Sequence, residues 1–145
     1  MPSSVACVDA SLVVALVCPE EMSDRALALW ERWMREDVRA VAPYLLQYEV
    51  TSALRRKVVR GYICEEDGRR ALEAALGLDI ELMHPPGLCR QAFELAARLG
   101  LPSAYDAQYL ALAELADAPL WTADERLYNA VRASLPYVCW LGSYE

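Results

Sequence analysis

Short apolar runs rich in β-branched residues alternate along this chain with longer segments in which apolar residues recur at helical spacing. The short runs cover residues 5–9, 39–42, 80–83, 120–122 and 137–140. The helical segments cover residues 12–17, 21–35, 44–60, 65–76, 88–99, 104–116 and 125–134. Strands that alternate with helices predict a parallel sheet with helices on both faces. We therefore expect an α/β fold, a three-layer α/β/α sandwich around a mostly parallel sheet of about five strands.

The length and composition favour a single domain with a substantial core. The chain has 145 residues, of which 56% are hydrophobic and 24% are charged. A chain of this size buries roughly two-thirds of the surface that it exposes when unfolded, and we expect one domain over residues 1–145. The longest apolar run, residues 12–18, is too short to span a membrane and follows no basic leader. We expect a cytoplasmic protein whose five scattered cysteines are reduced thiols.

Several classes of function lack the residues that they need. A net charge of -7 argues against a non-specific nucleic-acid binder, whose surface is normally basic. His84 is the only histidine in the sequence, which excludes a ribonuclease that uses one histidine as acid and another as base. The glycine-rich fingerprints of dinucleotide sites, P-loops and hydrolase elbows do not occur in the sequence. Carboxylates are the remaining candidates for chemistry.

Two aspartates follow predicted strands at the point where a helix begins. Asp9 closes the first strand, and Asp124 follows the strand at residues 120–122. Each has a local alternative role as the N-cap of the next helix. The carboxyl ends of parallel strands also form the edge of the sheet where ligands bind. Both aspartates are therefore candidates for one shared site.

Two more acids fall on helix faces that otherwise carry apolar residues. Glu49 lies in the apolar arc of the segment 44–60, where a structural salt bridge is the alternative to a functional role. Asp106 shares a face with Tyr109, so we expect its carboxylate on the side that meets the sheet. The alternative for Asp106 is a capping box with Ser103.

The four acids together predict a metal site more strongly than any one of them does. Asp9, Glu49, Asp106 and Asp124 can converge on one crevice, where like charges repel unless a cation holds them. A ligand set of oxygens without histidine or cysteine selects a hard ion. We therefore expect Mg²⁺ as the cofactor, with Mn²⁺ able to substitute.

These acids and their neighbours resemble the PIN domain family, and within it the VapC-like toxins of type II toxin–antitoxin pairs. The matching segments are Val8-Asp9-Ala10-Ser11, Glu49 followed by Leu54, residues 103–107 and residues 122–127, in the family's order. The resemblance implies a metal-dependent ribonuclease whose catalytic and metal-binding residues are Asp9, Glu49, Asp106 and Asp124. It places Thr122 beside the acids as a secondary member of the site, together with Ser11.

The resemblance also implies partners and products. The expected partners are an RNA substrate, a cognate antitoxin protein and a second copy of the chain in a homodimer. Asp9 and Asp106 would be direct metal ligands, Asp124 would complete the coordination, and Glu49 would ligate or orient the attacking water. The expected products carry a 5′-phosphate and a 3′-hydroxyl.

Five basic residues are candidates for contacts with RNA: Arg55, Arg56, Lys57, Arg60 and Arg126. The alternative for the first four is a favourable charge at the C-terminus of a helix. Two divalent ions bound at the acids would offset four of the excess negative charges, so the acidic balance does not exclude RNA.

Two pairs of aromatic residues recur at helical spacing, Trp30 with Trp33 and Tyr44 with Tyr48. Core packing is the first interpretation of both pairs. The second is a homodimer face or a groove that receives an antitoxin segment.

Two other functions stay open on the sequence. A PIN-like protein retained for partner binding alone would keep the same acids without cleaving RNA. A receiver-like module would use Mg²⁺ and an acidic pocket to accept a phosphoryl group. That module needs a lysine near the last strand, whereas the only lysine is Lys57 in a predicted helix.

Overall fold

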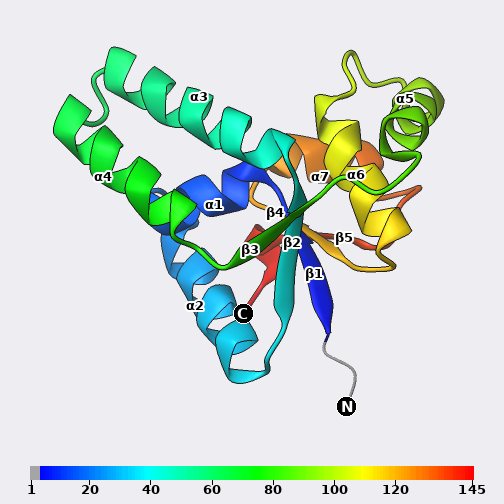
Figure 1. The fold of residues 1–145 in the computed structure, drawn as a ribbon, viewed down its shortest axis with the longest axis horizontal. Helices are drawn as coiled ribbons and strands as arrows, with labels where there is room; N and C mark the ends of the chain where they lie inside the picture. Colours follow the sequence, from blue (N-terminus) through cyan, green and yellow to red (C-terminus); the bar gives the residue numbers. More distant parts are fainter. Residues whose placement is uncertain (1–3) are drawn as a thin grey trace.

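A five-stranded sheet forms the centre of the computed structural model, which describes residues 4–145 (Figure 1). The strands are β1 (Val5–Val8), β2 (Arg39–Pro43), β3 (Ile80–Met83), β4 (Leu120–Thr122) and β5 (Val138–Trp140). Their order is β3-β2-β1-β4-β5, and every neighbouring pair is parallel. The expected α/β fold is confirmed.

The helices cover both faces of this sheet. They are α1 (Ala10–Val17), α2 (Ser23–Arg35), α3 (Leu45–Val59), α4 (Glu65–Leu76), α5 (Leu88–Leu99), α6 (Tyr105–Leu115) and α7 (Glu125–Val131). In Figure 1, α1 to α4 lie on one side of the sheet and α5 to α7 on the other. The chain winds outward from β1 to β3 and then returns to β4 on the other side of β1. Ligands bind at such a change of direction in parallel sheets.

The core shows why the central strands lack an alternating polar pattern. Cys7, Val8 and Leu120 have no exposed surface because helices cover both faces of the sheet. The helix α6 is apolar around most of its circumference and packs against β1, β2, β4 and α5. A helix of this kind belongs in the interior. Its one acid in the first turn, Asp106, is therefore an exception to its pattern.

Most predicted boundaries agree with the structure to within two residues, and α7 is the exception. The sequence predicts this helix over residues 125–134, but it ends at Val131. Pro136 contributes to the difference, because it has no backbone N–H to donate to the Arg132 carbonyl four residues earlier. A short 3₁₀ helix (Leu141–Ser143) follows β5 and has no predicted counterpart.

The two aromatic pairs have different environments. Trp33 is buried, and the ring of Trp30 packs on it with 5.9 Å between centroids, which confirms core packing for this pair. Tyr44 and Tyr48 are exposed, so core packing is wrong for them. They lie on the solvent side of the α3 region, whose buried residues are Leu46, Val50 and Leu54. Tyr44 stacks on the exposed ring of His84 instead.

The remaining sequence expectations concern cysteines and membranes. All five cysteines are free thiols, and Cys7 and Cys18 are buried. Burial raises the pKa of the Cys7 thiol well above its ordinary value, so this side chain packs as a small apolar group. No helix within residues 4–145 is both long and apolar enough to cross a membrane.

Candidate active site

A cavity of about 550 Å³ opens where β1 and β4 end, at the change of direction in the strand order. All four predicted acids line it: Asp9, Glu49, Asp106 and Asp124. Asp9 follows β1, Asp124 lies two residues after β4, and Glu49 and Asp106 come from α3 and α6. The fold therefore brings four acids from distant parts of the sequence to one place.

Asp9 is the most buried of these acids, with 5% of its surface exposed. Its Oδ1 accepts hydrogen bonds from the Leu12 N–H at 3.1 Å and the Ser11 hydroxyl at 2.7 Å, and its Oδ2 accepts one from the Thr122 hydroxyl at 2.5 Å. Removal from water raises the pKa of Asp9 from 3.8 to about 6. The three hydrogen bonds oppose this rise, and the negative charge of Asp106 adds to it. Asp9 is thus both the N-cap of α1 and an acid that is costly to ionise.

Ser11 and Thr122, the predicted secondary residues, hold Asp9 in place. Their hydroxyl oxygens lie 3.2 Å apart. Ser11 Oγ also accepts from the Ala123 N–H at 2.9 Å, and Thr122 Oγ1 accepts from the Asp124 N–H at 3.0 Å. This network joins the end of β1 to the end of β4, so it fixes the position of one acid relative to the backbone of another.

Glu49 has a tyrosine hydroxyl as its partner. Tyr109 Oη donates to Glu49 Oε1 at 2.6 Å, and the Tyr109 side chain is only 1% exposed. Burial, the bond to Glu49 and the charge of Glu49 all raise the pKa of Tyr109 above its ordinary value, so the hydroxyl keeps its proton. Glu49 belongs to none of the ion pairs within residues 4–145, which removes the salt-bridge alternative. The only hint of this bond in the sequence is the spacing that puts Tyr109 and Asp106 on one predicted helix face.

Asp106 faces the cavity and not the sheet, so this part of the prediction is wrong. It lies in the first turn of α6, where no preceding turn covers it, while Tyr109 takes the buried position. A side-chain cap for α6 is also absent within residues 4–145, which removes the capping-box alternative. Although the side chain has accessible surface, the cavity walls withdraw it partly from water, and this raises the pKa of Asp106. The charges of Glu49 and Asp124 raise the pKa further, and Arg126 lowers it.

Asp124 caps α7, as its local alternative predicted. Its Oδ1 accepts from the Arg126 N–H at 3.0 Å and from the Leu127 N–H at 3.2 Å. Both bonds use the same oxygen, and a carboxylate offers about four lone-pair sites. Capping therefore leaves Asp124 with acceptor capacity at the cavity.

The helix α3 supplies a basic wall to the cavity, defined by Arg56, Lys57 and Arg60. Lys57 forms an ion pair with Glu20 across the cavity at 3.6 Å. The only lysine of the chain therefore lies on α3, away from the last strand, where a receiver-like module would need it.

The two other predicted basic residues lie elsewhere. Arg55 points towards α4 and pairs with Glu65 at 3.5 Å, and it does not line the cavity. Arg55 comes one residue before Arg56 and Lys57, and the turn of about 100° per residue places it at the side of the helix that faces α4. Arg126 is not a lining residue, but its charge lowers the pKa of Asp106, so it acts on the acids.

Several cavity residues were not predicted from the sequence. Glu20 and Glu21 lie between α1 and α2, Tyr62 follows α3, and Trp140 ends β5. These residues stand in loops or at the end of an edge strand, where the sequence carries no periodic signal to assign their direction.

The donor set of the cavity fits a hard divalent cation. Its acids offer only oxygen ligands, which suit Mg²⁺ or Mn²⁺. Within residues 4–145, no three side chains of the metal-ligating types stand close enough to hold an ion as they are. Burial is the largest cause of the raised pKa values of Asp9 and Asp106, and the charges of neighbouring carboxylates add to both.

Comparisons with known proteins find relatives along most of the chain. The family model for the PIN domain matches residues 6–133. Ribonuclease VapC9 of Mycobacterium tuberculosis is 40% identical over 98 residues, which are 68% of this chain and 75% of that protein. Ribonuclease VapC1 of the same organism is 38% identical over 124 residues, which are 85% of this chain and 88% of that protein.

Solved structures share the fold at lower identity. Mycobacterium tuberculosis VapC20, described as a sarcin–ricin loop cleaving toxin, has a TM-score of 0.67 at 21% identity and covers 91% of this chain and 96% of its own. A toxin–antitoxin complex from Klebsiella pneumoniae has a TM-score of 0.64 at 17% identity and covers 92% of this chain and 95% of its own. These structures confirm the arrangement of sheet and helices.

Proposed function

This chain belongs to the PIN domain family, and we propose that it is an Mg²⁺-dependent endoribonuclease that hydrolyses RNA phosphodiester bonds. The observation that carries the proposal is the convergence of Asp9, Glu49, Asp106 and Asp124 on one cavity. The relatives that are named ribonucleases support the same activity.

The four acids would divide the work of holding the metal and the water. Asp9, Asp106 and Asp124 would ligate the cation, and Glu49 would ligate it or orient the attacking water. When bound, one or two Mg²⁺ ions neutralise the charge of the phosphoryl oxygens and activate the nucleophile. Tyr109 donates to Oε1 of Glu49 and so fixes this carboxylate, which keeps Oε2 as an acceptor for water. The products would carry a 5′-phosphate and a 3′-hydroxyl.

The basic wall would hold the RNA backbone beside the acids. Arg56, Lys57 and Arg60 line the same cavity as the carboxylates, and cations of this kind bind phosphates without regard to sequence. Metal ions bound at the acids would remove the repulsion that the acids exert on RNA. The net charge of the metal-free chain is therefore a poor guide to its affinity for nucleic acid.

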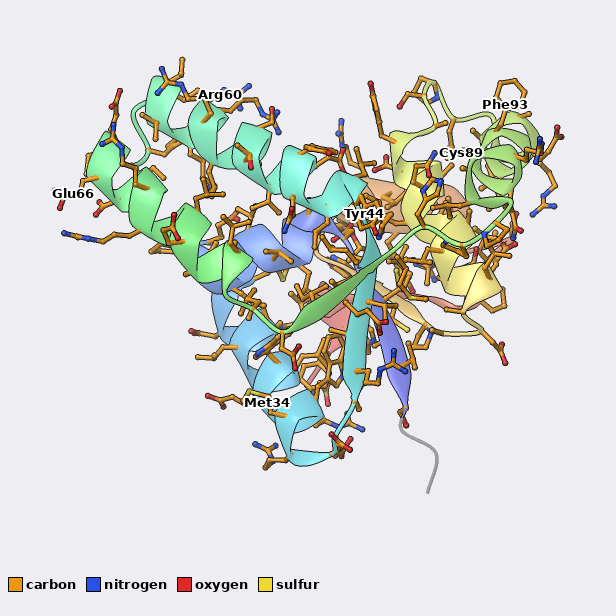
Figure 2. All side chains as sticks on the ribbon, in the orientation of Figure 1. Met34, Tyr44, Arg60, Glu66, Cys89 and Phe93 are labelled. Atoms are coloured by element: carbon orange, nitrogen blue, oxygen red, sulfur yellow. The ribbon has the colours of Figure 1, made fainter. Side chains whose placement is uncertain are left out.

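The biological role that we propose is that of a toxin controlled by a cognate antitoxin protein. Relatives named VapC and the structural similarity to a chain of a toxin–antitoxin complex support this role. We also propose a homodimer, because large apolar side chains such as Phe93 on α5 stand exposed (Figure 2).

Cleavage of RNA by the purified protein tests the activity. We expect cleavage with Mg²⁺ or Mn²⁺, no cleavage after exhaustive chelation, and weaker activity with Zn²⁺, because every ligand is an oxygen. Glu49→Gln should abolish or strongly reduce cleavage. Glu73→Gln supplies the matched control, because Glu73 is an exposed acid on α4 outside the cavity.

Two results would contradict the proposal in different ways. Cleavage that survives chelation, or that Glu49→Gln leaves intact, would remove the metal mechanism. RNA binding with no cleavage under any metal would make the chain a PIN-like binding protein.

A further inference from the structure

The cavity extends beyond the acids along one face of α3. Its lining residues are Glu49, Ala53, Arg56 and Lys57 on this helix and Arg60, which caps it, at the spacing of a single helical face. Figure 2 shows the direction of the helix, with Tyr44 beside the sheet and Arg60 at the outer end. From Glu49 to Arg60 the helix rises about 16 Å. A stacked nucleic-acid strand advances about 3.4 Å per nucleotide, so this face can accompany several nucleotides.

The outer part of this face carries charge that ion pairs do not neutralise. Arg56 donates to the Ser52 hydroxyl at 3.0 Å, and neither Arg56 nor Arg60 belongs to an ion pair within residues 4–145. Lys57 is partly neutralised by Glu20. Two guanidinium groups therefore remain available for phosphates along the wall.

An aromatic ring stands at the outer end of the same cavity. Tyr62 lines the cavity and is 73% exposed. The backbone holds it there, because Gly61 has a left-handed φ of 77° and the Tyr62 N–H donates to the Lys57 carbonyl at 2.9 Å, as in a Schellman turn. The Lys57 ammonium lies over the ring, 5.9 Å from its centroid. The ring is thus positioned before any ligand arrives, with most of its surface open.

We propose that Tyr62 is a stacking subsite for an unpaired nucleobase of the RNA, several nucleotides away from the bond that is cleaved. This inference rests on the proposed ribonuclease function and adds a substrate-binding residue to it. An exposed aromatic ring beside a row of cations is the combination that binds single-stranded nucleic acid, because the cations follow the backbone and the ring stacks on a base. A base-paired nucleotide cannot offer its face in this way.

Binding of a fluorescein-labelled single-stranded RNA, measured by anisotropy with Mg²⁺ present, tests the subsite. All variants are made in the Asp106→Asn background, in which we expect the RNA to stay intact. Tyr62→Leu removes the ring and Tyr62→Phe keeps it. Tyr48→Leu is the matched control, because Tyr48 is 72% exposed on α3 but does not line the cavity.

We expect Tyr62→Leu to weaken binding about fivefold or more, while Tyr62→Phe and Tyr48→Leu bind like the parent. The slope of log affinity against log salt should stay unchanged in Tyr62→Leu, because a stacked ring displaces no counterions. Arg60→Ala should instead flatten this slope by about one.

Scanning the RNA with single abasic nucleotides tests the same subsite without changing the protein. An abasic nucleotide at one position should weaken the binding of the RNA to the parent protein. The same RNA should bind Tyr62→Leu no more weakly than the intact RNA does. Unchanged affinity of Tyr62→Leu, or an abasic scan without such a position, would overturn the subsite. Loss of antitoxin binding with unchanged RNA binding would assign Tyr62 to a protein partner and also overturn it. Metal-dependent cleavage by the wild-type protein, measured in parallel, reports on the ribonuclease function separately.

Discussion

Replacing Asp9 with asparagine should remove a pH-dependent loss of stability from the metal-free protein. Asp9 is almost completely buried, and its pKa rises from 3.8 to about 6. A folded-state pKa above the unfolded value means that the folded protein prefers the protonated acid. The stability that this acid contributes is therefore fully present below about pH 4 and is lost as the pH rises through about 6. The rise from 3.8 to about 6 corresponds to about 3 kcal/mol of unfolding free energy.

The hydrogen bonds around Asp9 can accommodate an amide. The amide oxygen can keep the bonds from the Leu12 N–H and the Ser11 hydroxyl, and asparagine caps a helix as well as aspartate does. The amide nitrogen can donate to Thr122 Oγ1, whose own hydrogen can turn to Ser11 Oγ at 3.2 Å. One amide hydrogen is left over, at a cost of about 1 to 3 kcal/mol if it stays unsatisfied. That cost does not change with pH. It lowers the unfolding free energy of Asp9→Asn equally at every pH and leaves the shape of the plot of stability against pH unchanged.

Urea unfolding followed by circular dichroism, with chelator present and from about pH 4 to about pH 8, measures this effect. Relative to Asp9→Asn, the wild type should lose about 3 kcal/mol of stability across this range. Asp24→Asn is the control, because Asp24 is an exposed aspartate in the first turn of α2 and should keep the wild-type profile. Parallel curves for wild type and Asp9→Asn would refute the reasoning, since they would mean that folding does not hinder ionisation of this carboxylate.

Three further substitutions separate the roles of the cavity residues. Asp106→Asn should raise the melting temperature in chelator, because it removes one of the mutually repelling charges. It should also reduce the extra stabilisation by Mg²⁺, because it removes a proposed ligand. A lowered melting temperature with a normal Mg²⁺ response would contradict this. Tyr109→Phe should cost about 1 kcal/mol of unfolding free energy and lower kcat more than it raises KM, because Glu49 loses the donor that orients it; unchanged kcat would make Tyr109 a core residue only. Arg56→Ala should reduce the salt slope of RNA binding by about one, whereas Arg55→Ala should leave the slope unchanged, because Arg55 faces α4; an unchanged slope for Arg56→Ala would place Arg56 outside the RNA path.

The order and type of the helices and strands follow from the sequence because the periodicity changes sharply at each boundary. Segments such as Glu65–Leu76 and Leu88–Leu99 have the same limits in prediction and structure. The order of the strands in the sheet is a different matter. It depends on which apolar faces pack together over long distances in the chain, and no local pattern records that choice.

The candidate site was predictable in its acids but not in their surroundings. Acids interrupt the apolar pattern at Glu49 and at strand ends, and such interruptions can be recognised residue by residue. The bond from Tyr109 to Glu49 joins α6 to α3 and depends on how these two helices meet. The directions of Arg55 and of Asp106 likewise depend on fine rotation of a helix, which spacing alone does not determine.

Helix capping and metal binding are compatible roles in this fold, and they are not competing explanations of the aspartates. In a parallel sheet the end of a strand leads directly to the start of a helix, so an aspartate that caps the helix stands at the edge where ligands bind. The three aspartates differ in how many oxygens their local bonds use: Asp9 uses both, Asp124 uses one, and Asp106 caps no helix within residues 4–145. In the proposed metal site, Asp9 would therefore be the fixed ligand, and Asp106 would be the ligand least held by local hydrogen bonds. The relief of charge repulsion when a cation binds should therefore be largest at Asp106, because the charges of Glu49 and Asp124 both raise its pKa.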